Sequence, residues 1–114
     1  MKVDDIRVFV PSRDFDESKA FYSELGFAKE DINDELVLFT SGECSFFLQR
    51  YYHEEFAKNL MLQLTVLDIE DTFKLVSSLE GFEIRHSQLR VEPWGRVFNL
   101  WGPSGELWNI TEFD

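Results

Sequence analysis

The chain contains two copies of one residue pattern, and the second copy begins 54 residues after the first. The first copy consists of Asp14, Phe15, Ser18, Phe21, Tyr22 and Leu25, and the second of Asp68, Ile69, Thr72, Leu75, Val76 and Leu79. A glycine follows each copy, at Gly26 and at Gly81. Two copies are too few for a solenoid, so the repeat predicts a pseudo-symmetric domain of two modules with a cleft between them. Clefts of this kind are common binding sites for small ligands.

Charge and composition narrow the classes of partner. Twenty-two acidic residues against eleven basic ones give a formal net charge of -11, which argues against nucleic acid and against anionic membranes as partners. The acidity serves solubility and would also attract a cationic ligand. No run of about 18 apolar residues is present to cross a membrane. The single cysteine, Cys44, is expected as a small buried side chain in a strand, and its lack of a disulfide partner favours a cytoplasmic protein.

The first module is predicted to span residues 1–50. Asp14 is a typical helix N-cap, with Glu17 at the spacing of a capping box, and Gly26 suits the position that follows the helix. Four positions of the repeat then lie on one helical face: Ser18, Phe21, Tyr22 and Leu25. Strands are expected at residues 5–10, 27–30, 36–40 and 44–49.

The second module is predicted to span residues 60–114 and to repeat this order after a linker at 51–59. Asp68 is expected to cap its helix and Gly81 to end it. Strands are expected at residues 61–66, 82–85, 97–101 and 107–111. The chain is therefore predicted to be one α+β domain, residues 1–114, in which two βαβββ modules form a paired, incompletely closed, barrel-like sheet with a cleft. One helix per module covers one sheet face, so the other face must line a cavity or meet a partner.

These residues carry a resemblance to a known superfamily. The paired modules resemble the vicinal oxygen chelate superfamily of glyoxalases, extradiol dioxygenases and bleomycin resistance proteins. Val10-Pro11-Ser12-Arg13-Asp14-Phe15-Asp16 and Leu25-Gly26-Phe27 look like the opening of the bleomycin resistance proteins, and Pro93-Trp94-Gly95-Arg96-Val97-Phe98 and Gly102-Pro103-Ser104-Gly105-Glu106 are similar to their closing hairpin. The likeness covers nearly the whole chain.

The resemblance identifies four positions where catalytic members place metal ligands. Counting from the motifs puts these positions at Arg7, at Phe47 or Gln49, at Leu62 and at Asn109. Catalytic members fill most of them with histidine or carboxylate, because a divalent cation needs imidazole or anionic oxygen donors. Arginine, leucine and phenylalanine cannot serve, so we expect no metal, no cofactor and none of the superfamily's usual chemistry.

Aromatic residues then become the main candidates for ligand contact. Trp94 lies in a Pro-Trp-Gly turn, where an exposed ring serves recognition, whereas Trp101 and Trp108 are expected in the core. The full set of predicted ligand-binding residues is Trp94, Phe39, Phe47, Gln49, Leu62, Phe98, Asn109 and Arg7. Such a cleft suits a flat, positively charged aromatic molecule held by stacking and cation–π contacts.

The arginines leave the charge of the ligand open. Arg7 and Arg96 are expected to pair internally with a carboxylate such as Glu92 or Glu112, because an unpaired buried charge is costly. A free arginine in the cleft would instead favour a carboxylate or a thiol conjugate as ligand.

Three functions follow from these observations. The first is a metal-free homodimer that sequesters a cationic aromatic molecule, as bleomycin resistance proteins do, and the resemblance implies two equivalent pockets at the subunit interface. The second is a glyoxalase-like lyase or isomerase with a rearranged metal site. The third is a binding module for an endogenous metabolite.

Overall fold

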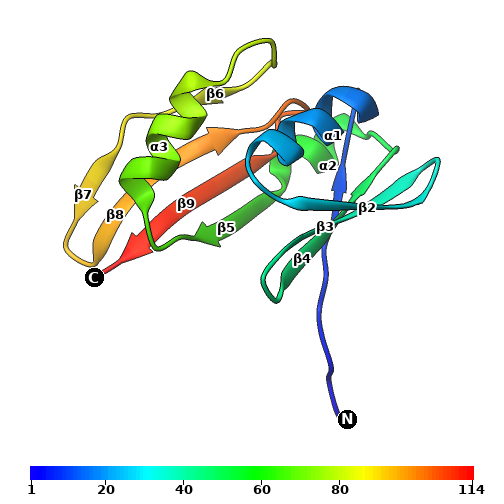
Figure 1. Cartoon of the computed structure of the whole chain (residues 1–114), viewed down its shortest axis with the longest axis horizontal. Helices are drawn as coiled ribbons and strands as arrows, with labels where there is room; N and C mark the ends of the chain where they lie inside the picture. The colour runs from blue at the N-terminus through cyan, green and yellow to red at the C-terminus, as the bar shows by residue number, and fades with distance from the viewer.

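The computed structural model describes all 114 residues and shows two β-sheets, each covered on one face by a helix (Figure 1). The first module comprises β1 (Phe9–Pro11), α1 (Phe15–Glu24), β2 (Ala28–Asn33), β3 (Leu36–Ser41) and β4 (Cys44–Gln49). The second comprises β5 (Met61–Thr65), α3 (Ile69–Ser78), β6 (Arg85–His86), β7 (Arg90–Glu92), β8 (Gly95–Trp101) and β9 (Leu107–Phe113). A short helix, α2 (Glu54–Asn59), lies between them. No helix is long and apolar enough to span a membrane.

The two sheets have matching topologies. Their strand orders are β1-β4-β3-β2 and β5-β9-β8-β6, with β7 also paired to β8. In each sheet the first strand of the module runs parallel to the last, while the hairpins β3–β4 and β8–β9 are antiparallel. Neither sheet closes into a barrel. The predicted α+β fold of two βαβββ modules is confirmed.

The structure differs from the sequence prediction at the N-terminus and in the linker. The first strand begins at Phe9, and the N-terminal end of the chain extends away from the body of the molecule (Figure 1). The linker at 51–59 contains α2, which the sequence analysis did not predict. Glu54 and Glu55 in the first turn of α2 and Lys58 in the last complement the helix dipole, and Lys58 pairs with Glu54 one turn away.

Helix α1 is capped as predicted, but its capping box is only half formed. The Asp14 carboxylate accepts a hydrogen bond from the Glu17 backbone N–H at 3.0 Å. The Glu17 side chain does not return the bond to the N-cap residue. It accepts instead from the backbone N–H of Glu83 at 2.8 Å, and thereby links the first module to the second.

Helix α3 begins after Asp68 as predicted, yet a side chain of β9 caps it. The Ile69 N–H donates to the Glu112 carboxylate at 3.1 Å, and the Asp68 side chain makes no capping bond to the backbone. Glu112 also accepts from the Arg96 guanidinium, which confirms the predicted internal pairing of Arg96. The hydrogen bond from Arg96 holds the pKa of Glu112 below its ordinary value.

One hydrophobic core joins the helix-covered faces of both sheets. Trp108 of β9 packs against Phe46 and Tyr22 of the first module, with ring centroids 5.3 and 5.9 Å apart, so its predicted place in the core is confirmed. The prediction that Cys44 is buried is wrong. Cys44 is the first residue of β4, beside the hairpin turn, and its side chain is exposed.

A chain of buried hydrogen bonds crosses this core between the modules. Trp108 Nε1 donates to Tyr22 Oη at 2.8 Å, Tyr22 Oη donates to Glu106 Oε2 at 2.8 Å, and the Ser104 backbone N–H donates to Glu106 Oε1 at 2.9 Å. Glu106 is completely buried, and this burial raises its pKa above the ordinary glutamate value of 4.5. A side chain at Gly102 would meet the Glu106 carboxyl group at 2.6 Å, so it would displace that group from the network.

This burial predicts a specific pH dependence of stability. The pKa of Glu106 is higher in the folded than in the unfolded protein. Its contribution to the free energy of unfolding is therefore full below the unfolded pKa of 4.5 and is lost as pH rises through the folded pKa. Glu106→Gln removes the titration and disturbs one hydrogen bond, at a cost of about 1–2 kcal/mol at low pH. The stability advantage of the wild-type protein over Glu106→Gln should therefore shrink between about pH 4 and about pH 8, as measured by urea unfolding.

The matched control is Glu43→Gln, which removes an exposed carboxyl group outside this network. A stability difference between wild type and Glu106→Gln that grows with pH would show that the hydrogen bonds from Tyr22 and Ser104 outweigh the burial of the Glu106 carboxylate.

Candidate functional site

Each sheet has one face without a helix, which we call its open face. On the open face of the first sheet, the rings of Phe9 and Phe47 stack with centroids 4.8 Å apart, and Phe9 is 45% exposed. Arg7 lies beside Phe47, 5.8 Å from the ring centroid, and donates from Nε to Ser45 Oγ at 2.9 Å. Strand alternation places Gln49 on this face as well. The first open face therefore combines an aromatic pair, of which Phe9 is exposed and Phe47 half-buried, with one guanidinium and one amide.

The charge of Arg7 is not free. Its Nε lies 3.3 Å from Oδ2 of Asp5, and both side chains are exposed. The predicted partners Glu92 and Glu112 are not used by Arg7, because Arg7 lies on the first sheet whereas these glutamates belong to the second.

The open face of the second sheet carries a cluster of neutral polar side chains. Thr111 Oγ1 donates to Asn109 Oδ1 at 2.6 Å, and Asn109 Nδ2 donates to Asn99 Oδ1 at 3.4 Å. Gln63 Nε2 reaches Asn109 Oδ1 at 3.5 Å and Thr111 Oγ1 at 3.4 Å. The cluster offers amide donors and acceptors without a formal charge.

A second exposed aromatic pair lies at one end of this face. The ring centroids of Trp94 and Phe113 are 5.6 Å apart, and the two side chains are 45% and 51% exposed. Phe113 follows Asn109 and Thr111 at a spacing of two residues along β9, so all three side chains lie on the open face. The Asp114 N–H donates to the Trp94 carbonyl at 3.1 Å and fixes the turn. Trp94 is thus an exposed ring in a turn, the position expected from the Pro-Trp-Gly sequence.

Three of the predicted ligand-binding residues do not reach an open face. Phe39 and Phe98 are completely buried in the core, and Leu62 packs against that core. The predicted orientation of these three side chains is wrong. Counting from Asp68 places Leu62 one residue out of register, whereas Phe39 and Phe98 are candidates only as aromatic residues and belong to the core. On β5 the residue that faces Asn109 is Gln63.

Two residues of the open faces were not predicted, although the sequence contained a signal for each. Leu62 and Leu64 alternate with Gln63, which is typical of a strand whose leucines face the core. Phe113 follows Asn109 at an even spacing, so a β9 extended to residue 113 would have placed its ring on the same face.

The open faces do not provide the ligands of a metal centre. Three of the predicted ligand positions carry a guanidinium at Arg7, a ring at Phe47 or an amide at Gln49, and an amide at Asn109. The fourth, Leu62, packs against the core, and its neighbour Gln63 adds another amide to the open face. No group of three or more histidine, cysteine, aspartate or glutamate side chains lies close enough to hold a metal ion. This donor set does not fit the divalent cation of the catalytic superfamily members.

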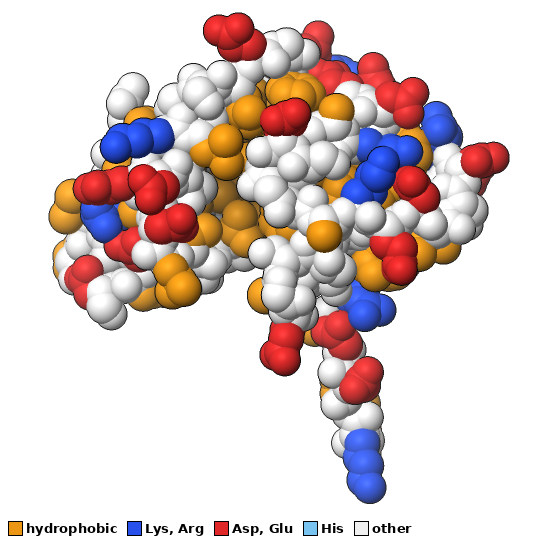
Figure 2. Space-filling view, viewed as in Figure 1, with side chains coloured by type: hydrophobic (Ala, Val, Ile, Leu, Met, Phe, Trp, Pro, Cys, Tyr) orange, Lys and Arg blue, Asp and Glu red, His pale blue; other side chains and the backbone are white.

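A separate apolar groove lies between the modules, and Figure 2 shows it as a hollow with hydrophobic atoms between the two lobes. Its volume is about 590 Å³, and its only charged lining residues are Asp68 and Asp71. Its apolar lining includes Leu25, Phe27, Leu64, Val66, Leu75 and Leu100. None of the predicted ligand-binding residues lines this groove.

Comparison with known proteins supports the fold. No family model and no curated protein matches the sequence. A bleomycin-binding protein solved in complex with bleomycin superposes with a TM-score of 0.79 at 21% identity, over 98% of this chain and 100% of that chain. A bleomycin resistance determinant encoded on the transposon Tn5 gives a TM-score of 0.80 at 21% identity, over 98% and 99% of the two chains.

A glyoxalase family protein from Bacillus anthracis gives a TM-score of 0.77 at 18% identity, over 100% of this chain and 98% of that one. The chain therefore has the fold shared by bleomycin-binding proteins and glyoxalase family proteins. The predicted resemblance to the vicinal oxygen chelate superfamily is confirmed at the level of the fold.

The side chains of the open faces predict that the protein holds no divalent metal ion. Protein purified without chelator should carry well below about one divalent ion per chain, and Zn²⁺ or Mn²⁺ should give no saturable heat in calorimetric titration. Excess EDTA should leave the melting temperature unchanged. About one tightly held ion per chain would contradict this account and favour the lyase or isomerase hypothesis.

Proposed function

We propose that this protein is a metal-free, antibiotic-binding homodimer that sequesters a cationic aromatic molecule. The observation that carries the proposal is that each open face presents an aromatic pair with at least one exposed ring. Phe9 with Phe47 lies on one face and Trp94 with Phe113 on the other. Large aromatic surfaces left in water by a folded chain are typical of a ligand or protein interface.

The arrangement of the two sheets supports a dimer. The helix-covered faces meet in one core, so the open faces point away from that core and a single chain supplies only separate walls. A twofold dimer would place the first open face of one chain against the second open face of its partner. This pairing creates two equivalent clefts, each with Phe47 on one wall and Trp94 on the other.

The chemistry of these walls favours a flat cation. Aromatic faces attract cations through their quadrupoles, and the net charge of -11 raises the local concentration of positively charged molecules. Gln49 and Asn109 can accept or donate hydrogen bonds, which would orient the ligand without chemistry. Arg7 adds no free positive charge, because Asp5 accompanies it.

The similar structures support an antibiotic as the ligand, because they include bleomycin-binding proteins of the same fold. The alternative of a binding module for an endogenous metabolite uses the same site. The two differ in whether bleomycin itself binds, and the following titration distinguishes them.

We expect metal-free bleomycin to quench the tryptophan fluorescence saturably, at about one ligand per chain, and more weakly at high salt. Trp94→Ala should weaken binding by about 10- to 100-fold, because the indole supplies stacking and cation–π contact. The matched control is Phe56→Ala, which removes an exposed ring on α2, outside both open faces.

Two results would contradict the proposal. Absence of quenching at tens of micromolar bleomycin would remove this antibiotic as the ligand and leave the metabolite. A chain that stays monomeric at micromolar concentration in sedimentation experiments, with or without bleomycin, would remove the two-chain cleft.

A further inference from the structure

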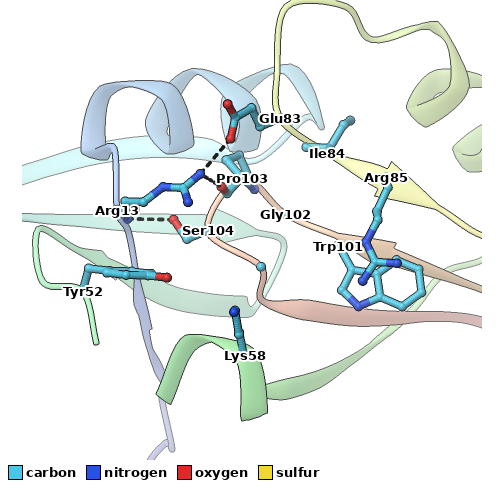
Figure 3. Close-up of a pocket in the computed structure, with 11 residues that line it drawn as sticks. Arg13, Tyr52, Lys58, Glu83, Ile84, Arg85, Trp101, Gly102, Pro103 and Ser104 are labelled. Atoms are coloured by element: carbon cyan, nitrogen blue, oxygen red, sulfur yellow. Dashed lines mark hydrogen bonds and ion pairs between the residues drawn. The ribbon is translucent and has the colours of Figure 1, made fainter. Parts of the chain in front are cut away.

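Three of the eleven basic side chains of this acidic chain line a groove between the modules, which we call the basic groove (Figure 3). Its volume is about 570 Å³, and its main side chains are those of Arg13, Tyr52, Lys58, Glu83, Arg85 and Trp101, with the turn at 102–105 as its floor. Its three cations are Arg13, Lys58 and Arg85, and the first two pair with the carboxylates of Glu83 and Glu54. Arg85 is therefore the unpaired cation, and the local charge is about +1. At physiological salt a bound molecule responds mainly to charges within about 8 Å, so this groove favours anions.

Arg85 provides free hydrogen-bond donors in the groove. Its guanidinium lies flat on the Trp101 ring, 3.9 Å from the centroid, and makes no hydrogen bond or ion pair within the chain (Figure 3). Stacking uses the face of the guanidinium and leaves its in-plane N–H groups available. A planar fork of this kind matches a carboxylate or a phosphate group in two parallel hydrogen bonds.

The floor of the groove is fixed before any ligand arrives. The Ser104 N–H is held by buried Glu106, and Ser104 Oγ accepts from the Arg13 N–H at 2.7 Å. The Arg13 guanidinium donates to Glu83 at 2.7 Å and to the Pro103 carbonyl at 3.4 Å. Binding therefore needs little ordering of the turn, which favours affinity.

The remaining side chains supply a movable charge and a flat surface. Lys58 pairs only with Glu54, in an exposed bridge of the kind that contributes little, so its ammonium can turn to an incoming anion. The ring of Tyr52 borders the groove on the side opposite Trp101 (Figure 3). A ligand with an aromatic ring can stack on Tyr52 or on the outer face of the Arg85 guanidinium.

We propose that the basic groove is a second ligand site, for an aromatic organic anion whose carboxylate or phosphate group binds Arg85 and Lys58. This inference goes beyond the proposed function, because the ligand has the opposite charge. None of the residues proposed to bind the cationic molecule lines the groove.

The test is an NMR titration of the ¹⁵N-labelled full chain with 1-naphthyl phosphate and with 1-naphthoate. We expect both anions to shift the Trp101 indole N–H signal saturably, with the higher affinity for the anionic group that the groove prefers. Neutral 1-naphthol should bind about tenfold more weakly. Arg85→Gln and Lys58→Gln should each lower the affinity for the anion by about tenfold. Both side chains are exposed, so neither substitution should unfold the chain.

The matched control is Arg90→Gln, which removes the same charge from β7, outside the groove. Equal affinity for 1-naphthol and the two anions, equal effects of Arg85→Gln and Arg90→Gln, or no saturation below about 5 mM would overturn the proposal. None of these results bears on bleomycin, so failure here and failure of the proposed function are distinguishable.

Discussion

The buried carboxyl group of Glu106 is the constraint on which the relation between the two modules depends. It accepts hydrogen bonds from Tyr22 of the first module and from the Ser104 backbone of the second, and Tyr22 in turn accepts from Trp108. A buried polar group of this kind must be fully satisfied or it becomes costly, so the chain has one good arrangement at this point. The network fixes the turn at 102–105, and with it the start of β9.

Both candidate ligand sites follow from this arrangement. Trp108 packs in the core on the covered face of β9. Because side chains alternate along a strand, Asn109 and Phe113 then lie on its open face. The same turn that Glu106 holds forms the floor of the basic groove, where Arg13 binds Ser104. The chain thus carries two kinds of surface, with aromatic rings and amides on the open faces and the unpaired guanidinium of Arg85 at the groove.

The repeated pattern made the fold predictable, but it did not determine which face of each strand meets the core. The N-cap at Asp14 and the topology of two modules could be read from residue spacing, because local hydrogen bonds and helical periodicity determine them. The prediction for Leu62 is wrong, since one residue of register reverses a strand's faces, and the rings of Phe39 and Phe98 pack in the core. Nothing local to Arg85 indicated its stacking on Trp101, which depends on the pairing of β6 with β8.

In the proposed dimer, each binding cleft takes its two walls from two chains. The most direct test mixes a Phe47→Ala chain with a Trp94→Ala chain, refolds them together and counts the bleomycin sites of wild-type affinity. If each cleft pairs the first sheet of one chain with the second sheet of the other, every mixed dimer regains one intact cleft, so about one quarter of all sites should recover. If the walls came from the same chain, every site would keep one damaged wall, and mixing would restore no tight binding.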